Sequence, residues 1–313
     1  HKNSDLDSFG ASLGVAKIAK AYGKKTNIVV DLDSIEKKTK DVVTIVKSDE
    51  RYKGLIVTYT EAMERINKNT LLIIVDNHKP SLAISSALLE RVRNKVIIDH
   101  HRRGEEFIEA PVLTYLEPAA SSTVELVVEL CDYQNVDLNI NELDATIMYA
   151  GMLVDTNNFK QRVGVRTFQS AAQLKELQAN VTQAYEFLED SYEDTLKKLS
   201  ITQEAYQYND YILIACGQEN QEYSRTMLAK ASNSMLEVSS IKASFTIGRV
   251  SKTMVALSAR SAKDINVQII MENMGGGGHF SMAAAQFENQ SIEEVRVLLE
   301  EKIKEYLDDR GEV

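Results

Sequence analysis

KVIIDHHRR, residues 95–103, places three polar side chains directly after a short apolar run. Residues 96–98 predict a buried parallel strand, because strands that are covered on both faces are apolar throughout. Asp99, His100 and His101 then follow at the carboxyl end of that strand, where open α/β sheets bind their ligands. Two of the five histidines of the chain are adjacent here, so this segment predicts a functional site.

Length and composition indicate two globular domains. With 313 residues, 44% of them hydrophobic, the chain can form two cores. The formal net charge of −10 disfavours binding to long nucleic acid, although it is compatible with a small anionic substrate. Cys131 and Cys216 fit no ligand spacing and predict buried thiols in a reducing compartment. No apolar run approaches the roughly 18 residues of a membrane span, and no signal peptide opens the chain, so we expect a cytoplasmic fragment without membrane contact.

The first segment, HKNSDLD, contains a histidine and two aspartates within seven positions. A helix is predicted over residues 11–22, and the simplest interpretation makes Asp7 or Ser8 its N-cap and places Asp5 in a turn. The chain starts at His1 without the apolar strand that precedes comparable segments. We therefore expect a fragment whose upstream part is absent.

Two later segments also end in carboxylates. TLLIIVDNHKP, residues 70–80, predicts a buried strand that ends at Asp76, with an N-cap and turn as the simpler interpretation. A helix predicted over residues 142–154 runs into Asp155, whose charge opposes the helix dipole unless a cation binds there.

Carboxylates and imidazoles together suit Mn²⁺, Mg²⁺, Fe²⁺ or Zn²⁺. Two such ions about 3.5 to 4 Å apart would neutralise the carboxylates and lower the pKa of water from about 15.7 toward about 7, for attack on phosphorus.

The order of predicted elements gives an α/β fold with two domains. We expect a mainly parallel sheet in residues 1–186 and a smaller mixed sheet in residues 209–313. The charge-rich helical pattern between them predicts a linker over residues 187–208.

Four consecutive glycines, residues 275–278, precede His279 in the second domain. Glycine N–H groups can approach a phosphate closely, and Ser258, Arg260 and Asn266 lie upstream of the run. A plain flexible loop is the alternative. We favour phosphate or nucleotide binding, because all five histidines of the chain then lie in candidate motifs.

Taken in order, these motifs resemble the DHH/DHHA1 phosphoesterase superfamily. HKNSDLD, VDNH, DHHRR and MLVDTNNF resemble the four motifs of a DHH domain, and GGGGH resembles the signature of a DHHA1 domain. EPAASST, RTF and NVQIIMENMGGGGH are most similar to the catalytic region of GdpP-type cyclic-di-AMP phosphodiesterases. The resemblance implies a DHH domain and a DHHA1 domain, with the active site in the cleft between them.

The resemblance also implies residue roles and two Mn²⁺ cofactors, with Mg²⁺ or another divalent ion as alternatives. Expected ligands are His1, Asp5 and Asp76 for one ion, and Asp7, Asp76, His100 and Asp155 for the other. Asp76 would bridge the ions, Asp99 would support the site, and His101 would contact the scissile phosphate. Expected substrate contacts are Arg102, Ser122, Arg260, Asn266, Gly276, Gly277, Gly278 and His279.

The implied reaction hydrolyses one phosphodiester bond of cyclic di-AMP to linear 5′-pApA, with cyclic di-GMP as a slower substrate. The alternative is a nanoRNase or single-strand exonuclease acting on short linear oligonucleotides such as pApA. A pyrophosphatase fits the nucleotide-type second domain less well, and a non-catalytic cyclic-dinucleotide sensor stays open. The expected partner is a cyclic dinucleotide and not long nucleic acid, with a homodimer left open. Upstream helices would anchor the full-length protein to the cell membrane.

Overall fold

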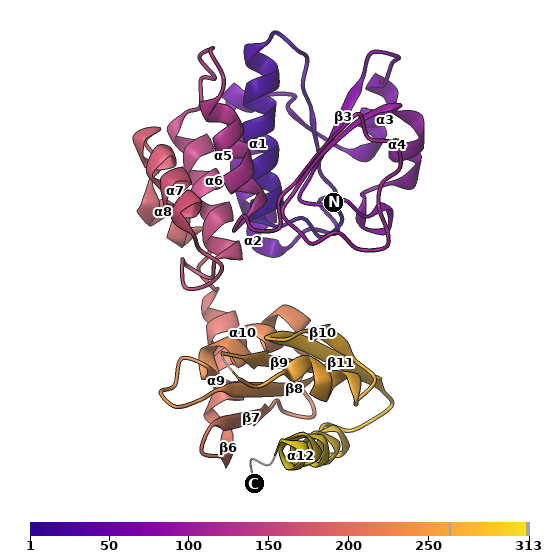
Figure 1. Ribbon diagram of the computed structural model, residues 1–313, viewed down its shortest axis with the longest axis vertical. Coiled ribbons are helices and arrows are strands. Elements are labelled where there is room, and N and C mark those ends of the chain that lie inside the picture. The colour runs from indigo at the N-terminus through magenta and orange to yellow at the C-terminus, as the bar shows by residue number, and fades with distance from the viewer. Residues whose placement is uncertain (263, 311–313) are drawn as a thin grey trace. The chain divides into compact units, whose positions relative to one another are not determined.

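The computed structural model describes residues 1–262 and 264–310, which form two compact units (Figure 1). The first is His1–Glu189 and the second starts at Asp190. A parallel sheet in the first unit and a mixed sheet in the second confirm the predicted α/β class. The predicted boundaries, at residues 1–186, 187–208 and 209–313, stay predictions.

Three parallel strands form the main sheet of the first unit, in the order β3 (Leu71–Val75), β4 (Asn94–Asp99) and β5 (Leu113–Leu116). The central strand β4 confirms the strand predicted over residues 96–98. Because the strands are parallel, Asp76 and the Asp99–His101 triplet leave the sheet at the same edge. A separate parallel pair, β1 (Ile28–Val29) and β2 (Ile56–Val57), lies outside this sheet.

Helices α1 (Leu6–Ala21), α5 (Thr123–Asp132) and α6 (Glu142–Asp155) pack against one another in the first unit. Helix α1 begins five residues before its predicted start, because the Asp5 carboxylate accepts a hydrogen bond from Ser8 N at 3.0 Å. Asp5 is therefore the N-cap, and the interpretation that placed Asp5 in a turn and the cap at Asp7 or Ser8 is wrong.

The other helices of this unit are shorter or less buried. They are α2 (Lys37–Ser48), α3 (Tyr59–Arg65), α4 (Ser86–Arg91), α7 (Val165–Glu176) and α8 (Val181–Glu186), with 3₁₀ turns at Glu50–Tyr52 and Pro80–Leu82. Helix α7 contains Arg166 and Thr167 in its first turn.

The second unit contains a six-stranded mixed sheet in the order β10-β11-β9-β8-β7-β6. Its strands are β6 (Tyr206–Asn209), β7 (Ile212–Cys216), β8 (Ala243–Ser251), β9 (Met254–Ser261), β10 (Gly277–His279) and β11 (Met282–Glu288). Strands β7 and β8 are parallel, and all other neighbours are antiparallel. The glycine run is therefore not a loop throughout, because its last two residues lie in the edge strand β10.

Helices cover both faces of this sheet. Helices α11 (Val267–Glu272) and α12 (Ile292–Asp309) share one core with the sheet, and α9 (Tyr192–Gln203) and α10 (Arg225–Met235) share another. Helix α9 lies in the predicted linker, yet its Ile201 is fully buried in the core of the second unit. None of the helices in the described part of the chain is long and apolar enough to cross a membrane.

Gly151 allows α6 to pack directly on the start of α1. A methyl group at this position would lie 2.7 Å from the Leu6 carbonyl oxygen and 2.9 Å from Asp7 Cα. We predict that Gly151→Ala lowers the free energy of unfolding by about 1–3 kcal/mol, as overpacking does, and weakens divalent metal binding because it displaces Asp7. Gly164→Ala is the control, because a methyl group there meets no atom within 4 Å. Denaturant unfolding and metal titration test both variants, and equal behaviour of the two would contradict the packing argument.

Candidate metal centre

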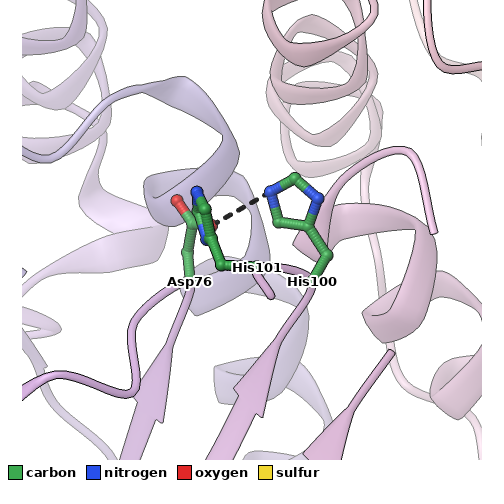
Figure 2. A group of neighbouring side chains, drawn as sticks. All are labelled: Asp76, His100 and His101. Atoms are coloured by element: carbon green, nitrogen blue, oxygen red, sulfur yellow. Dashed lines mark ion pairs between the residues drawn. The ribbon is translucent and has the colours of Figure 1, made fainter. Parts of the chain in front are cut away.

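Asp76, His100 and His101 converge at the carboxyl edge of the parallel sheet, as Figure 2 shows. Asp76 Oδ1 lies 3.5 Å from His100 Nε2 and 3.5 Å from His101 Nδ1. Asp76 has a φ of 58°, a conformation that costs energy for a residue other than glycine. Its backbone N–H donates to Ile98 O at 2.9 Å, so the neighbouring strand holds this turn in place.

A second group joins Asp7, His100 and Asp155, whose nearest oxygen and nitrogen atoms all lie within 4.8 Å of one another. His100 Nε2 is 2.9 Å from Asp155 Oδ2, but it is buried and makes no hydrogen bond. The other ring nitrogen, Nδ1, faces the Ala120 carbonyl oxygen at 3.4 Å and therefore carries the proton. His100 thus turns Nε2, which makes no hydrogen bond, toward two carboxylates, and this places a nitrogen and two carboxylates where they could bind one metal ion.

The carboxylates of this cluster destabilise one another when no cation is present. Burial, followed by the charge of Asp155, raises the pKa of Asp7 to about 8. Burial and the charge of Asp5 raise the pKa of Asp155 to about 7. Burial and the charge of Asp7 also raise the pKa of Asp76 well above its usual range. A divalent cation would remove this penalty, so the donor set fits a metal site.

The first turn of α5 donates hydrogen bonds to two carboxylates of the cluster. Asp7 accepts hydrogen bonds from Thr123 N at 2.8 Å and Val124 N at 2.9 Å. Thr123 Oγ1 donates to Asp76 Oδ1 at 3.0 Å, a contact that we did not predict. The sequence signal was the serine and threonine run in EPAASST, from which we expected only Ser122 to contact the substrate. In the structure Ser122 is the N-cap of α5, and its buried hydroxyl accepts a hydrogen bond from Glu125 N at 3.1 Å.

His1 and Asp5, the remaining expected ligands, lie beside the same cluster. His1 Nε2 is 3.6 Å from Asp76 Oδ2. The charge of Asp5 contributes to the raised pKa of both Asp7 and Asp76, so its carboxylate is close to them. Arg102, expected to contact the substrate, is exposed just after β4. The structure therefore brings the six expected ligands into one region of the first unit.

Asp99 is buried within the same segment but behaves differently. It accepts hydrogen bonds from His101 N at 3.0 Å and His101 Nδ1 at 2.8 Å, and a further one from His78 Nδ1. Burial alone would raise the pKa of Asp99, but the bonds from His101 and His78 outweigh it and lower that pKa to about 2. Asp99 is thus an ionised residue whose oxygens are already occupied.

The remaining expected substrate contacts lie in the second unit, where a cavity of about 470 Å³ is lined in part by Arg260, Gly277 and Gly278. Arg260 donates to Ala259 O at 2.9 Å, while its Nε is buried without a partner. Burial lowers the pKa of this guanidinium, which an anionic ligand would counteract. Arg260 therefore has unused hydrogen-bonding capacity at the cavity.

The other residues predicted near this cavity have structural functions as well. Gly276 packs tightly on β11, because a methyl group there would lie 2.2 Å from Ala284 O. Asn266 is the N-cap of α11 and accepts a hydrogen bond from Gln268 N at 3.1 Å. His279 is exposed at the end of β10.

Comparison with known proteins identifies both units. Residues 1–152 match the DHH family, N-terminal domain, and residues 209–306 match the DHHA1 domain. The chain belongs to the DHH family. This DHH protein is 42% identical over 98% of its length to the cyclic-di-AMP phosphodiesterase GdpP of Bacillus subtilis (strain 168), and covers 47% of that relative. It is 38% identical over 98% of its length to the cyclic-di-AMP phosphodiesterase PdeA of Listeria monocytogenes serotype 1/2a (strain 10403S), again covering 47% of it.

A solved structure supports the fold of this DHH protein. The crystal structure of an exopolyphosphatase-related protein from Bacteroides fragilis has a TM-score of 0.80 and 19% sequence identity, and the match covers 98% of this chain and 90% of that one. The chain spans about half the length of the curated relatives that it matches.

We predict that Asp76→Asn abolishes binding of divalent metal to this DHH protein. Asp76 contacts His1 and His100, which belong to the two expected ligand sets, and loss of its charge weakens both. Electron paramagnetic resonance of added Mn²⁺ measures the bound fraction. Asp41→Asn, which removes an exposed carboxylate from α2, is the matched control and should bind like the wild type. Full Mn²⁺ binding by Asp76→Asn would refute the central position of Asp76.

We also predict that metal binding releases protons near pH 7. The raised pKa of Asp7, about 8, and of Asp155, about 7, means that the metal-free protein holds protons that a cation must displace. Apparent affinity should therefore rise as pH increases from 6 to 8.5. Calorimetric titrations in buffers of different ionisation enthalpy count the protons. Asp7→Asn should release fewer and Asp41→Asn the same number, whereas wild-type binding without proton release would contradict the assignment.

Proposed function

We propose that this chain is the catalytic region of a metal-dependent phosphodiesterase that hydrolyses cyclic di-AMP to linear 5′-pApA. The observation that carries the proposal is the cluster of Asp7, Asp76, His100 and Asp155, with a buried imidazole nitrogen that makes no hydrogen bond and with raised carboxylate pKa values. The choice of substrate rests on the similarity to GdpP and PdeA across nearly the whole chain. Cyclic di-GMP is the expected slower substrate.

Two Mn²⁺ ions, with Mg²⁺ as the alternative, are the proposed cofactors. The proposed ligands are His1, Asp5 and Asp76 for one ion, and Asp7, Asp76, His100 and Asp155 for the other. Bound divalent ions would supply charge neutralisation and a water of lowered pKa. The side chains of the protein set where those ions bind, because α5 fixes Asp7 and Asp76 through Thr123 and Val124.

We assign the substrate contacts to two sets of residues. In the first unit, His101 uses Nδ1 to bond Asp99, which leaves Nε2 for the scissile phosphate. Arg102, exposed in the same loop, would contact the phosphate as well. In the second unit, Arg260, Gly277 and Gly278 line a cavity, and we assign these residues to nucleotide binding. We assign Asn266, Gly276 and His279 supporting positions around it.

A nanoRNase or single-strand exonuclease acting on pApA is the second candidate, because the same metal chemistry cleaves linear phosphodiesters. The acidic net charge of −10 favours a small substrate in either case. We further propose that upstream helices anchor the full-length protein to the membrane and leave this region in the cytoplasm.

The test is to incubate the chain with Mn²⁺ and, separately, with cyclic di-AMP, cyclic di-GMP, pApA and pyrophosphate, and to separate the products by chromatography. We expect pApA as the product of cyclic di-AMP, with slower cleavage of cyclic di-GMP. Asp76→Asn should be inactive and Asp41→Asn fully active. Rapid turnover of pyrophosphate without cleavage of either cyclic dinucleotide would overturn the proposal, and preferential turnover of pApA would favour the second candidate.

A further inference from the structure

His78 is a buried histidine outside the expected ligand sets, two positions after Asp76. Its side chain is 1% exposed, and its Nδ1 lies 2.5 Å from Asp99 Oδ2. The backbone N–H of Gly104 points at the other ring nitrogen, Nε2, at 3.4 Å. Because Nε2 accepts a hydrogen bond, it carries no proton, so Nδ1 carries the proton and donates it to Asp99. The hydrogen bonds thus define one neutral tautomer of His78.

Asp99 in turn orients the His101 ring through hydrogen bonds to its other carboxylate oxygen. While Oδ2 is bonded to His78, Oδ1 accepts His101 N at 3.0 Å and His101 Nδ1 at 2.8 Å. Two of these three donors are fixed independently of the His101 ring, namely Nδ1 of the buried His78 ring and the backbone N–H of His101, so the carboxylate has one preferred rotation. The His101 ring, whose side chain is 52% exposed, is therefore held with Nδ1 inward and Nε2 available to a ligand.

The loop after the DHH triplet fixes His78 in turn. Phe107 stacks on the His78 ring with centroids 5.3 Å apart and an interplanar angle of 28°. The Arg103 guanidinium lies 4.5 Å from the centroid of Phe107, and Ile108 N donates to His78 O at 2.8 Å. This loop also contains Arg102, so His78 connects the loop to the sheet edge.

We propose that His78 is a positioning residue, which holds the Asp99 carboxylate so that His101 presents Nε2 to the substrate phosphate. The inference rests on the proposed function, since it assigns His101 to the substrate. Without His78, Asp99 Oδ2 would be buried without a donor, and the carboxylate would rotate toward other donors. His101 would then lose its fixed orientation although the metal ligands keep theirs. Supporting residues of this kind change activity by about 10–100-fold in other metal enzymes.

The kinetic test compares His78→Leu with His78→Asn. Leucine fills much of the ring volume but donates nothing, whereas the asparagine amide places an N–H near the position of Nδ1. We expect His78→Leu to lower kcat about tenfold or more, with KM and Mn²⁺ affinity close to the wild type. His78→Asn should recover most of kcat. Equal losses in both variants, or a loss explained entirely by weaker Mn²⁺ binding, would overturn the proposal.

A measurement that does not depend on turnover uses the metal-free protein. Long-range ¹H–¹⁵N correlation spectra report the tautomer of each histidine, and the chain has only five. We expect Nδ1–H tautomers for His78 and His101 in the wild type, and a mixture of tautomers for His101 in His78→Leu but not in His78→Asn. An unchanged His101 spectrum in His78→Leu would overturn the positioning role. Absence of wild-type cleavage of cyclic di-AMP, by contrast, would overturn the proposed function and leave this spectral test valid.

Discussion

The main constraint on the first unit is the repulsion among the carboxylates at the carboxyl edge of its parallel sheet, which the rest of the unit must offset. Asp7 and Asp76 are buried, Asp155 is 17% exposed, and burial with mutual repulsion raises the pKa of all three. Groups of like charge at this separation disfavour the folded state unless protons or cations accompany them. Helices α1, α5 and α6 contact one another beside the cluster, and hydrogen bonds from the first turn of α5 hold Asp7 in place.

The same helices also contribute residues to the candidate metal site, which the edge of the sheet alone does not form. Parallel strands bring Asp76 and His100 together, but Asp7 comes from the first turn of α1 and Asp155 from the last turn of α6. These two helix ends meet because Gly151 allows close packing. The N–H groups at the start of α5 then bond Asp7, so the positive end of a helix dipole offsets part of its charge. Helix packing and hydrogen bonding are thus as necessary as the strand topology.

The sequence was sufficient to predict the elements that depend on local patterns. The strand at residues 96–98 and the α/β class followed from apolar runs, and the expected ligands followed from the family motifs, which the structure brings together. The N-cap at Asp5 could not be decided, because Asp5, Asp7 and Ser8 all suit a cap and only the packing of Leu6 and Asp7 on α6 selects one. Thr123 was missed because its bond to Asp76 joins residues 47 positions apart. Gly276 was assigned to phosphate binding, and its contact with β11 depends on strand register that no local pattern shows.

Asp99 and Asp7 are both shielded from solvent, yet their pKa values move in opposite directions, and this contrast distinguishes a supporting carboxylate from a proposed metal ligand. Asp99 accepts three hydrogen bonds from two histidines, and these outweigh burial, so its pKa falls to about 2. Asp7 accepts two backbone hydrogen bonds but lies near Asp155 and Asp5, so its pKa rises to about 8. A carboxylate whose donors already satisfy it gains little from a cation, whereas one that faces other carboxylates gains much. Burial alone therefore does not distinguish the proposed metal ligand Asp7 from Asp99, whereas the balance of donors and neighbouring charges around each carboxylate does.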